Sequence, residues 1–288
     1  MIIAWGGPTP PDRRPEAPLT QLPRTRLFVD AALAAQTPVP LGAAQAHHLK
    51  TVLRKNAGDG IRLFNGRDGE WLAEVSTLGR SDGQAMAQSL IREQTAPGRL
   101  RLLVPPIKRS RLEWLVEKAT ELGVAAIDLV VTDHTDAARP KPDRLVIHAI
   151  DAAQQCERLD VPVITGPRSL GAWLDDWPAD QPLFVAAERC ADTKPAADAM
   201  AKAARLAGST PISVLVGPEG GLAPSELDAL RVLPFVALIG LGPRILRTET
   251  AALTALACWH CVAGDGSARP PAADVSTESI GGSRRANS

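Results

Sequence analysis

A glycine-rich segment carries residue types that could bind a small ligand. Residues 214–226 have the sequence VLVGPEGGLAPSE, which predicts an apolar strand, a glycine loop and a helix with Pro224 in its first turn and Glu226 at its positive end. Glycines let backbone amides approach a ligand closely. The segment lacks the Lys-Ser/Thr ending of a P-loop and the GxGxxG spacing, and a carboxylate at Glu219 suits a cationic or hydroxyl-bearing ligand better than phosphate. A tight strand-to-helix turn without a ligand stays open as the alternative.

A second segment repeats the arrangement of strand, loop and helix. Residues 238–252 have the sequence LIGLGPRILRTETAA, in which a glycine-proline loop leads into a long apolar helix. Thr248 is expected to be the N-cap of this helix, and Glu249 favours its positive end. Ile245 and Leu246 stand between charged residues, where apolar side chains either wall a ligand site or pack beneath the loop. Both segments are therefore candidates for a ligand site.

The elements around these loops alternate between strand and helix after a linker at residues 96–98. Short apolar runs predict strands, and the longer periodic stretches between them predict helices. This alternation is typical of a mainly parallel sheet with helices on both faces. The expected strands are residues 100–104, 127–131, 183–187, 213–216 and 236–238, and the expected helices are residues 112–122, 142–156, 195–206, 224–232 and 248–262.

Residues 24–92 have the pattern of a small β-rich domain. A hairpin turn is expected at Asn65-Gly66 or, three residues later, at Asp68-Gly69, because both dipeptides favour positive φ. Several short strands with one helix predict a small barrel. The expected strands are residues 26–29, 61–64 and 67–75, and the expected helix is residues 45–53.

The composition is that of an ordinary globular protein. The chain of 288 residues is long enough for two domains, 45% of it is apolar, and its formal net charge is zero. Zero net charge argues against a protein that binds polyanions over its whole surface, whereas a local basic patch can still serve a small RNA footprint.

The cysteines and the chain ends indicate the cellular compartment and the ordered part of the chain. Cys258 and Cys261 form a CxxC pair in an apolar helix pattern, and no second CxxC exists, so buried thiols in a reducing compartment are expected rather than a metal site. Neither a secretory signal nor a run of about 20 apolar residues occurs, which predicts a cytoplasmic protein without a membrane partner. The proline- and glycine-rich ends, residues 1–23 and 264–288, are expected to be disordered.

Together the two loop segments resemble those of the SPOUT class of methyltransferases. More narrowly they are similar to the RsmE family, which methylates N3 of a uridine in small-subunit ribosomal RNA. The resemblance extends from about Arg24 to Val262. Gln154 departs from it, because the family more often has an acidic residue there. The further matching segments are residues 26–29, 47–54, 58–59, 64–66, 108–114 and 117–124.

This resemblance implies an architecture and an activity. The implied fold is α/β: an N-terminal PUA-like β-barrel, residues 24–95, followed by a SPOUT α/β methyltransferase domain with a trefoil knot, residues 98–263. The implied cofactor is S-adenosyl-L-methionine, and the implied partner is 16S ribosomal RNA or the small ribosomal subunit. The implied activity is methylation of N3 of a specific uridine in that RNA by a homodimer with its cofactor site near the interface.

The resemblance also implies site residues in two cofactor loops, with a third wall near Glu188 and Arg189. No metal site is expected, because His47 and His48 have no Cys or acidic cluster nearby. The residues expected to contact the cofactor are Gly217, Pro218, Glu219, Gly220, Gly221, Leu241, Gly242, Ile245, Leu246, Thr250 and Ala251. Those expected to be catalytic are Arg244, Arg247 and Glu249, and those expected to contact RNA are His48, Arg54, Lys108 and Arg111.

Several points stay open in the sequence. Uracil N3 carries a proton at neutral pH, so the reaction needs a base or a cation that stabilises the anion. Glu249, Arg244, Arg247 and, across a dimer, the helix beginning at Arg111 are all candidates, although Glu249 could simply serve its helix end. Trp114 lies off the apolar stripe of that helix and could stack on a base, pack at a subunit contact or be covered by a neighbouring element.

Other functions stay open as well. One is a SPOUT enzyme that methylates another RNA atom, such as a ribose 2′-hydroxyl. A second is a non-catalytic RNA-binding factor for ribosome assembly, against which the intact cofactor motifs weigh. A third is a glycine-loop enzyme for a small anionic metabolite, against which the β-domain weighs.

Overall fold

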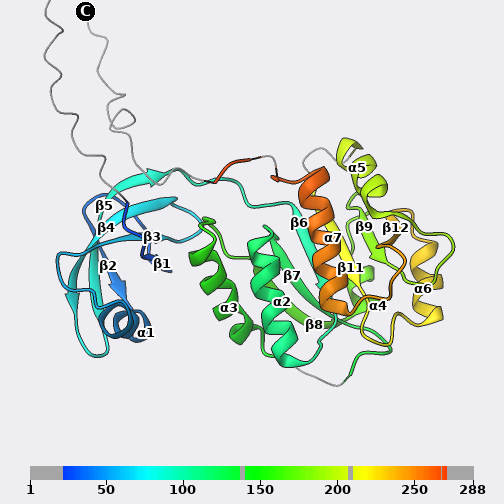
Figure 1. Cartoon of the computed structure of the whole chain (residues 1–288), viewed down its shortest axis with the longest axis horizontal. Helices are drawn as coiled ribbons and strands as arrows, with labels where there is room; N and C mark the ends of the chain where they lie inside the picture. Colours follow the sequence, from blue (N-terminus) through cyan, green and yellow to red (C-terminus); the bar gives the residue numbers. More distant parts are fainter. Residues whose placement is uncertain (1–21, 137–139, 207–209, 267, 271–288) are drawn as a thin grey trace, which may run out of the picture.

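Five strands of the N-terminal part form a curled sheet in the order β1-β3-β4-β5-β2 (Figure 1). β1 runs parallel to β3, and the other neighbouring strands are antiparallel. Three register shifts between β4 and β5 bend the pair. The computed structural model describes residues 22–136, 140–206, 210–266 and 268–270. The strands are β1 Arg26–Phe28, β2 Thr37–Leu41, β3 Gly60–Phe64, β4 Glu70–Leu78 and β5 Gly83–Arg92.

The turn between β3 and β4 uses both dipeptides that were expected to form it. Gly66 and Gly69 have φ values of 78° and 79°. The Asn65 side-chain oxygen accepts hydrogen bonds from the backbone amides of Arg67 and Asp68, at 3.0 and 2.9 Å. The alternative between the two turn positions is therefore resolved as one loop, residues 65–69, that requires both glycines.

The single helix expected at residues 45–53 is divided in the structure. An α-helix, α1 (Ala43–His47), is followed directly by one π-helical turn, η1 (His48–Val52). The Gln45 side chain accepts from the Gly42 amide at 2.9 Å, which begins the helix two residues earlier than expected. Arg54 then ends the segment with a φ of 53°.

Seven parallel strands form the second sheet, in the order β10-β12-β9-β11-β6-β7-β8. The five strands expected from apolar runs are all present. The two edge strands, β8 and β10, were not expected, because an edge strand is not buried on both sides and gives no continuous apolar run. The strands are β6 Leu100–Val104, β7 Ala126–Val131, β8 Val163–Ser169, β9 Leu183–Ala186, β10 Lys194–Pro195, β11 Ile212–Val216 and β12 Val236–Gly240.

Helices cover both faces of this sheet, as expected. One face packs on α2, α3, α5 and α7 through side chains such as Leu102, Val214 and Ile239. Alternate residues of the same strands, such as Leu103 and Leu215, face α4 and α6. The short α4 was not expected. The helices are α2 Arg109–Glu121, α3 Pro142–Gln155, α4 Leu170–Asp175, α5 Ala196–Leu206, α6 Pro224–Arg231 and α7 Thr248–Val262.

A buried charge cluster, here called the arginine junction, joins the curled sheet to the C-terminal end of α3. It consists of Arg26, Arg62, Arg92, Glu70 and Glu157. Glu70 is completely buried and accepts from Arg26 and, at 3.1 Å, from Arg92. Arg62 donates to Glu157 at 2.6 Å, and Arg26 and Arg92 also donate to backbone oxygens in residues 153–158. These contacts fix the curled sheet against the end of α3.

Gln154, which departs from the family pattern, also belongs to this contact. Its side-chain oxygen accepts from the Phe28 amide at 3.0 Å, and its backbone oxygen accepts from Arg26. Arg158 donates to the carbonyls of Thr120 and Val124 at 2.7 and 2.9 Å. Gln154 therefore stabilises the packing of α3 against β1, and Arg158 stabilises the packing of the segment after α3 against the end of α2.

The cysteines and chain ends add three observations. All four cysteines are free, and Cys258 is half-buried. The expectation of a buried pair is wrong for Cys261, which is exposed in the last turn of α7. No helix in the described ranges is long and apolar enough to cross a membrane. The ends expected to be disordered lie outside the described residues, apart from residues 22–23, 264–266 and 268–270.

Candidate functional site

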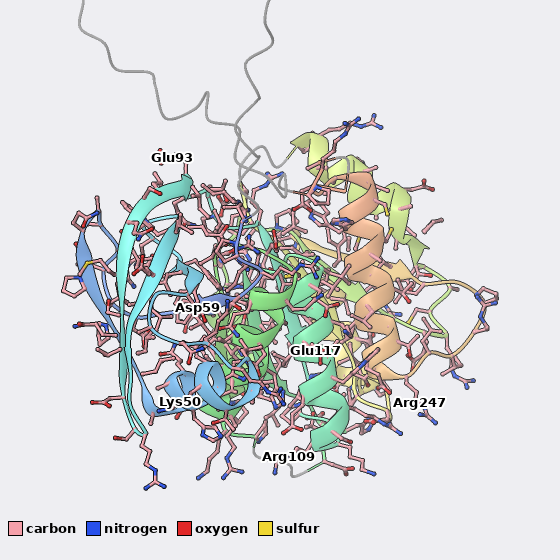
Figure 2. All side chains as sticks on the ribbon, turned by 60° about the vertical axis from the view of Figure 1, so that its left-hand side comes forward. Lys50, Asp59, Glu93, Arg109, Glu117 and Arg247 are labelled. Atoms are coloured by element: carbon pink, nitrogen blue, oxygen red, sulfur yellow. The ribbon has the colours of Figure 1, made fainter. Side chains whose placement is uncertain are left out.

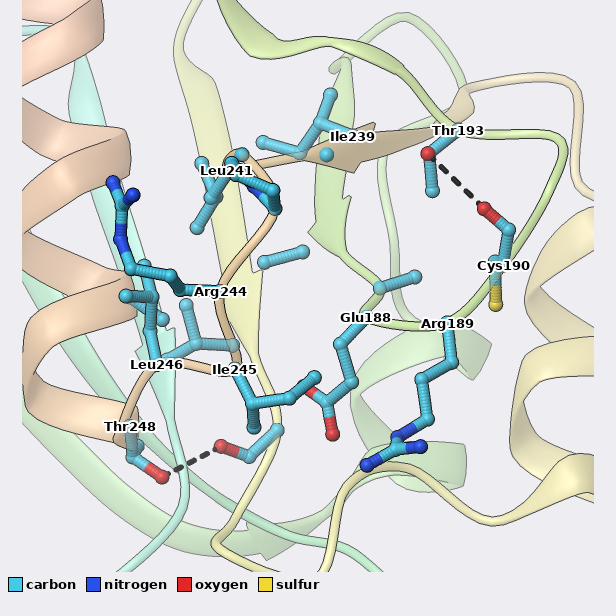
Figure 3. A pocket seen from close by; sticks show the side chains of 18 of the residues that line it. Glu188, Arg189, Cys190, Thr193, Ile239, Leu241, Arg244, Ile245, Leu246 and Thr248 are labelled. Atoms are coloured by element: carbon cyan, nitrogen blue, oxygen red, sulfur yellow. Dashed lines mark hydrogen bonds between the residues drawn. The ribbon is translucent and has the colours of Figure 1, made fainter.

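A cavity of about 370 Å³ opens at the carboxyl ends of β9, β11 and β12 (Figure 3). In an open parallel sheet this edge is where ligands bind, because the loops after the strands gather there. The two loops singled out in the sequence form most of its wall. The expected cofactor or catalytic residues that line it are Gly217, Pro218, Glu219, Leu241, Gly242, Arg244, Ile245, Leu246 and Ala251.

The glycine loop between β11 and α6 is held by side chains from outside it. α6 begins at Pro224, as expected, and Glu226 accepts from the Ala223 amide at 2.8 Å and from the Asp133 amide at 3.0 Å. Gly221 has a φ of 71°, and a β-carbon there would lie 3.0 Å from a carboxylate oxygen of Glu188. The loop thus depends on glycine both for its conformation and for the space that Glu188 occupies.

The loop between β12 and α7 is tied to the glycine loop by Thr248. The expectation that Thr248 caps α7 is wrong, because Arg247 occupies the N-cap position and Thr248 is the first helical residue. The Thr248 hydroxyl instead donates to the backbone oxygen of Gly217 at 2.9 Å (Figure 3). This bond crosses the base of the cavity and couples the positions of the two loops.

The third wall comes from the segment after β9. Glu188 and Arg189 line the cavity, as expected, and the Glu188 side chain extends toward Ile245 (Figure 3). Cys190 and Thr193 also line it and were not expected. Thr193 donates to the Cys190 carbonyl at 3.2 Å, and this local turn has no sequence signal that marks it as part of a pocket.

Five residues expected to contact the cofactor or to be catalytic do not line the cavity: Gly220, Gly221, Arg247, Glu249 and Thr250. The carbonyl oxygens of Gly220 and Gly221 instead accept from His134 Nδ1, each at 3.1 Å. Thr250 and Arg247 are exposed on the first turn of α7. Direct cofactor contact by Gly220, Gly221 and Thr250 and a catalytic role for Arg247 and Glu249 stay predictions. A side chain added at Gly220 would first meet His134.

Charged side chains of α2, the glycine loop and α7 meet beside the cavity, and we call Arg111, Glu219 and Glu249 the mouth cluster. Arg111 Nη1 donates to Glu219 Oε1 at 3.3 Å, and Arg111 Nε lies 3.6 Å from Glu249 Oε1. Figure 2 shows the start of α2, marked by Arg109, and the start of α7, marked by Arg247, at the same end of the molecule. Arg111 thus reaches the site within its own chain, whereas it was expected to act across a dimer.

The remaining expected RNA contacts are spread over the surface. Lys108 caps α2 and is exposed. His48 and Arg54 are exposed on the curled-sheet part, where His48 lines a groove of about 1190 Å³ against α3 and β8. Their RNA contacts stay predictions. Within the described residues, no group of three His, Cys, Asp or Glu side chains is placed to hold a metal ion.

Comparison with known protein families finds two matches, one in each part of the chain. A family model described as an RNA methyltransferase domain matches residues 94–260. A second, described as an RNA methyltransferase PUA domain, matches residues 41–84.

Curated relatives and solved structures agree with these matches. Ribosomal RNA small subunit methyltransferase E of Rickettsia conorii is 30% identical over 233 residues, which cover 81% of this chain and 93% of the relative. A putative methyltransferase of Legionella pneumophila with bound SAM superimposes with a TM-score of 0.72 at 26% identity, covering 82% of this chain and 96% of that one. The Neisseria gonorrhoeae methyltransferase E bound to S-adenosyl methionine gives a TM-score of 0.69 at 25% identity, with coverage of 82% and 96%.

Proposed function

Because the chain belongs to the RNA methyltransferase family of ribosomal small subunit methyltransferase E, we propose that it transfers the methyl group of S-adenosylmethionine to N3 of a uridine in 16S ribosomal RNA. The observation that carries this proposal is the cavity at the carboxyl ends of β9, β11 and β12, whose walls come from residues 217–219, from the loop of residues 241–251 and from the segment after β9. Two relatives of similar fold are described as bound to this same cofactor.

The cavity lining fits S-adenosylmethionine in its chemistry. Glu188 and Glu219 supply carboxylates for a sulfonium, an ammonium or ribose hydroxyls, and Arg189 and Arg244 supply guanidiniums for the cofactor carboxylate. Leu241, Ile245, Leu246 and Ala251 supply apolar surface for the adenine ring. Two carboxylates and two guanidiniums beside apolar surface suit a ligand that, like S-adenosylmethionine, carries both positive and negative groups together with an aromatic ring.

Bound S-adenosylmethionine supplies an electrophilic methyl group, so the protein must orient the uracil behind it and remove the N3 proton. Thr248 and Gly217 keep the two loops at a fixed separation, which sets where a methyl donor can lie. We assign Arg244, Arg247 and Glu249 to the charged surroundings of the uracil that is methylated, as the sequence suggested.

RNA contacts and the homodimer form the second part of the proposal. Exposed basic residues at Arg54 and Lys108 offer guanidinium and ammonium groups to the RNA backbone on both parts of the chain. Trp114 on α2 leaves 45% of its surface exposed, which fits a residue covered by a partner subunit or by a base. Sedimentation of the purified protein with and without RNA distinguishes a Trp114 covered by a partner subunit from a Trp114 covered by a base.

Two measurements test the proposed function. Isothermal titration should show binding of S-adenosylmethionine, and nucleoside mass mapping of methylated small-subunit RNA should identify the product. A methyl group on N3 of one uridine supports the proposal. A 2′-O-methyl product would show a different reaction of the same class, and titration without heat would refute the cofactor assignment.

A further inference from the structure

The two carboxylates of the mouth cluster differ in access to a substrate. The Glu219 side chain lines the cavity and is 51% exposed, so a base entering from solvent can reach it. The Glu249 side chain is 11% exposed and does not line the cavity. Glu188, Arg189 and Arg244 are the other charged residues of the lining. Of the two carboxylates beside Arg111, only Glu219 is therefore placed to touch a substrate.

Arg111 is held in a position that its own helix disfavours. It lies in the first turn of α2, which contains no acidic residue, and a cation there faces the positive end of the helix dipole. One oxygen of Glu249 is buried without a hydrogen-bond partner among the described residues, and its other oxygen lies 3.6 Å from Arg111 Nε. The interaction with Glu249 thus fixes the guanidinium at the mouth of the cavity.

Arg111 also keeps donors available for a ligand. A guanidinium has five N–H groups. Within the described part of the chain, the Arg111 guanidinium makes one hydrogen bond, from Nη1 to Glu219. The guanidinium and the Glu219 carboxylate therefore present a proton acceptor and several donors side by side at the mouth of the cavity.

From this geometry we infer that Glu219 accepts the N3 proton of the uracil while Arg111 donates to a flanking carbonyl oxygen, and that Glu249 is the positioning residue for Arg111. This inference rests on the proposed methylation of uridine N3. Deprotonated uracil carries its charge on N3 and on the two adjacent oxygens. A carboxylate alone is a weak base for this proton, and a guanidinium beside the developing charge makes the transfer easier.

The bonds balance without a further reactant. The N3–H bond breaks, its proton goes to a Glu219 oxygen, and the electron pair left on N3 forms the bond to the methyl carbon. The bond between that carbon and sulfur breaks, and its electron pair stays on sulfur in the leaving S-adenosylhomocysteine. Glu219 returns its proton to water after the products leave.

The test compares variants of the mouth cluster with control variants of an arginine and a glutamate on α2 that lie outside the cluster. Glu219→Gln, Glu219→Asp, Arg111→Lys and Glu249→Gln are measured beside the controls Glu117→Gln and Arg109→Lys. The readouts are single-turnover methylation of small-subunit RNA from pH 6 to pH 9, and dissociation constants for S-adenosylmethionine, S-adenosylhomocysteine and RNA. Melting temperatures establish that each variant is folded.

Glu219→Gln should lower the single-turnover rate by about 100-fold or more at neutral pH, since a general base contributes about 10²–10⁴-fold. The remaining rate should rise about tenfold per pH unit, because hydroxide then has to remove the proton. Glu219→Asp should retain the wild-type shape of the pH profile at a lower rate. Arg111→Lys should lower the single-turnover rate more than it weakens RNA binding. Glu249→Gln should lower the rate in the same way but by a smaller factor.

Two results would overturn the inference while leaving the proposed function intact. The first is a wild-type protein that makes N3-methyluridine together with a Glu219→Gln variant of unchanged rate and pH profile. The second is a Glu219→Gln variant that loses cofactor affinity but reaches the wild-type rate at saturating cofactor, because Glu219 would then only bind the cofactor. A wild-type product methylated elsewhere than on N3 would instead refute the proposed function.

Discussion

Arginine and glutamate meet in two regions of this molecule, the arginine junction and the mouth cluster, and the two regions differ in burial and hydrogen bonding. At the junction, Glu70 has no exposed surface and accepts from two guanidiniums. At the mouth, Arg111 is about one-third exposed and stands 3.3 and 3.6 Å from its two carboxylates. The same residue types thus hold the curled sheet to the end of α3 in one place and stay available to a ligand in the other.

This difference shows how charged residues that stabilise the fold can be told apart from charged residues that are available to a ligand. A buried carboxylate with all its partners in the chain is costly to disturb and offers nothing to a substrate. A half-exposed pair with unused donors contributes little to stability, because water already solvates it. Variants in the two regions should therefore change different quantities. Two variants at the junction and two in the loop and helix next to the mouth cluster test the comparison.

The largest effect is expected at Glu70. Glu70→Gln leaves Arg26, Arg62 and Arg92 without their shared buried carboxylate, and breaking such an interaction costs about 3–5 kcal/mol. Denaturant unfolding should show this loss directly. Glu74→Gln, on the same strand but exposed, is the matched control and should change stability by less than about 0.5 kcal/mol. Equal unfolding midpoints for Glu70→Gln and Glu74→Gln would contradict the structural role of the arginine junction.

A smaller effect is expected where the two cavity loops meet. Thr248→Val removes the hydroxyl that donates to Gly217, which should cost about 1 kcal/mol of folding free energy. Because the loops then lose their common anchor, binding of S-adenosylmethionine should weaken as well. Thr248→Ser keeps the hydroxyl and should retain both properties. Calorimetry of unfolding and of cofactor binding checks the pair, and a Val variant that binds like wild type contradicts the coupling.

A pH-dependent effect is expected at Glu157. The hydrogen bond from Arg62 holds the pKa of the Glu157 carboxyl below its ordinary value. The stabilisation is therefore present above the unfolded-state pKa of about 4.3 and is lost as the pH falls through the lower folded pKa. Glu157→Gln should be less stable than wild type at pH 7, and the two should converge in acid. Unfolding curves between pH 7 and pH 3 measure this, and a constant difference would contradict the assignment.

The smallest effect on stability is expected at Arg247. Arg247 is exposed, so Arg247→Ala should change the unfolding free energy by less than about 0.5 kcal/mol. Arg247, which we assign to the charged surroundings of the uracil, is expected to pair with a phosphate of the RNA as well. The slope of the logarithm of the RNA binding constant against the logarithm of the salt concentration should therefore become shallower by about 0.7–0.9. Arg231→Ala, whose guanidinium is paired with Asp192 and Asp228, should leave that slope unchanged. A slope unaffected by Arg247→Ala would exclude a phosphate contact.

Much of the fold could be predicted from the sequence, because interior strands and amphipathic helices leave local patterns. β6, β7, β9, β11 and β12 are buried on both sides, and each was predicted within a few residues. β8 contains Gly166 and Pro167 and has exposed residues such as Val163, so no apolar run marks it. The family model and the structural relatives support the two-part architecture. The exact domain bounds and the trefoil knot stay predictions.

The candidate site was predictable where it is local in sequence. Both loops were found because glycine, proline and charged residues follow apolar strands. The contacts from Arg111 to Glu219 and from His134 to Gly220 were not found, because they join residues far apart in the chain and only the sheet order brings them together. Thr248 was assigned as a cap for a related reason, since its bond to Gly217 has no local pattern.

The strand order of the parallel sheet has a consequence for how the chain folds during synthesis. All five strands of the curled sheet are complete once residue 92 has emerged, so this part can fold early. β6 lies between β7 and β11, and β11 ends only at Val216, so the middle of the parallel sheet must wait for more than a hundred further residues. Pairing over such separations is slow, because the long loop must close before the contact stabilises it. The N-terminal part therefore has time to form first and to offer Arg26 and Glu70 as a ready surface for the end of α3.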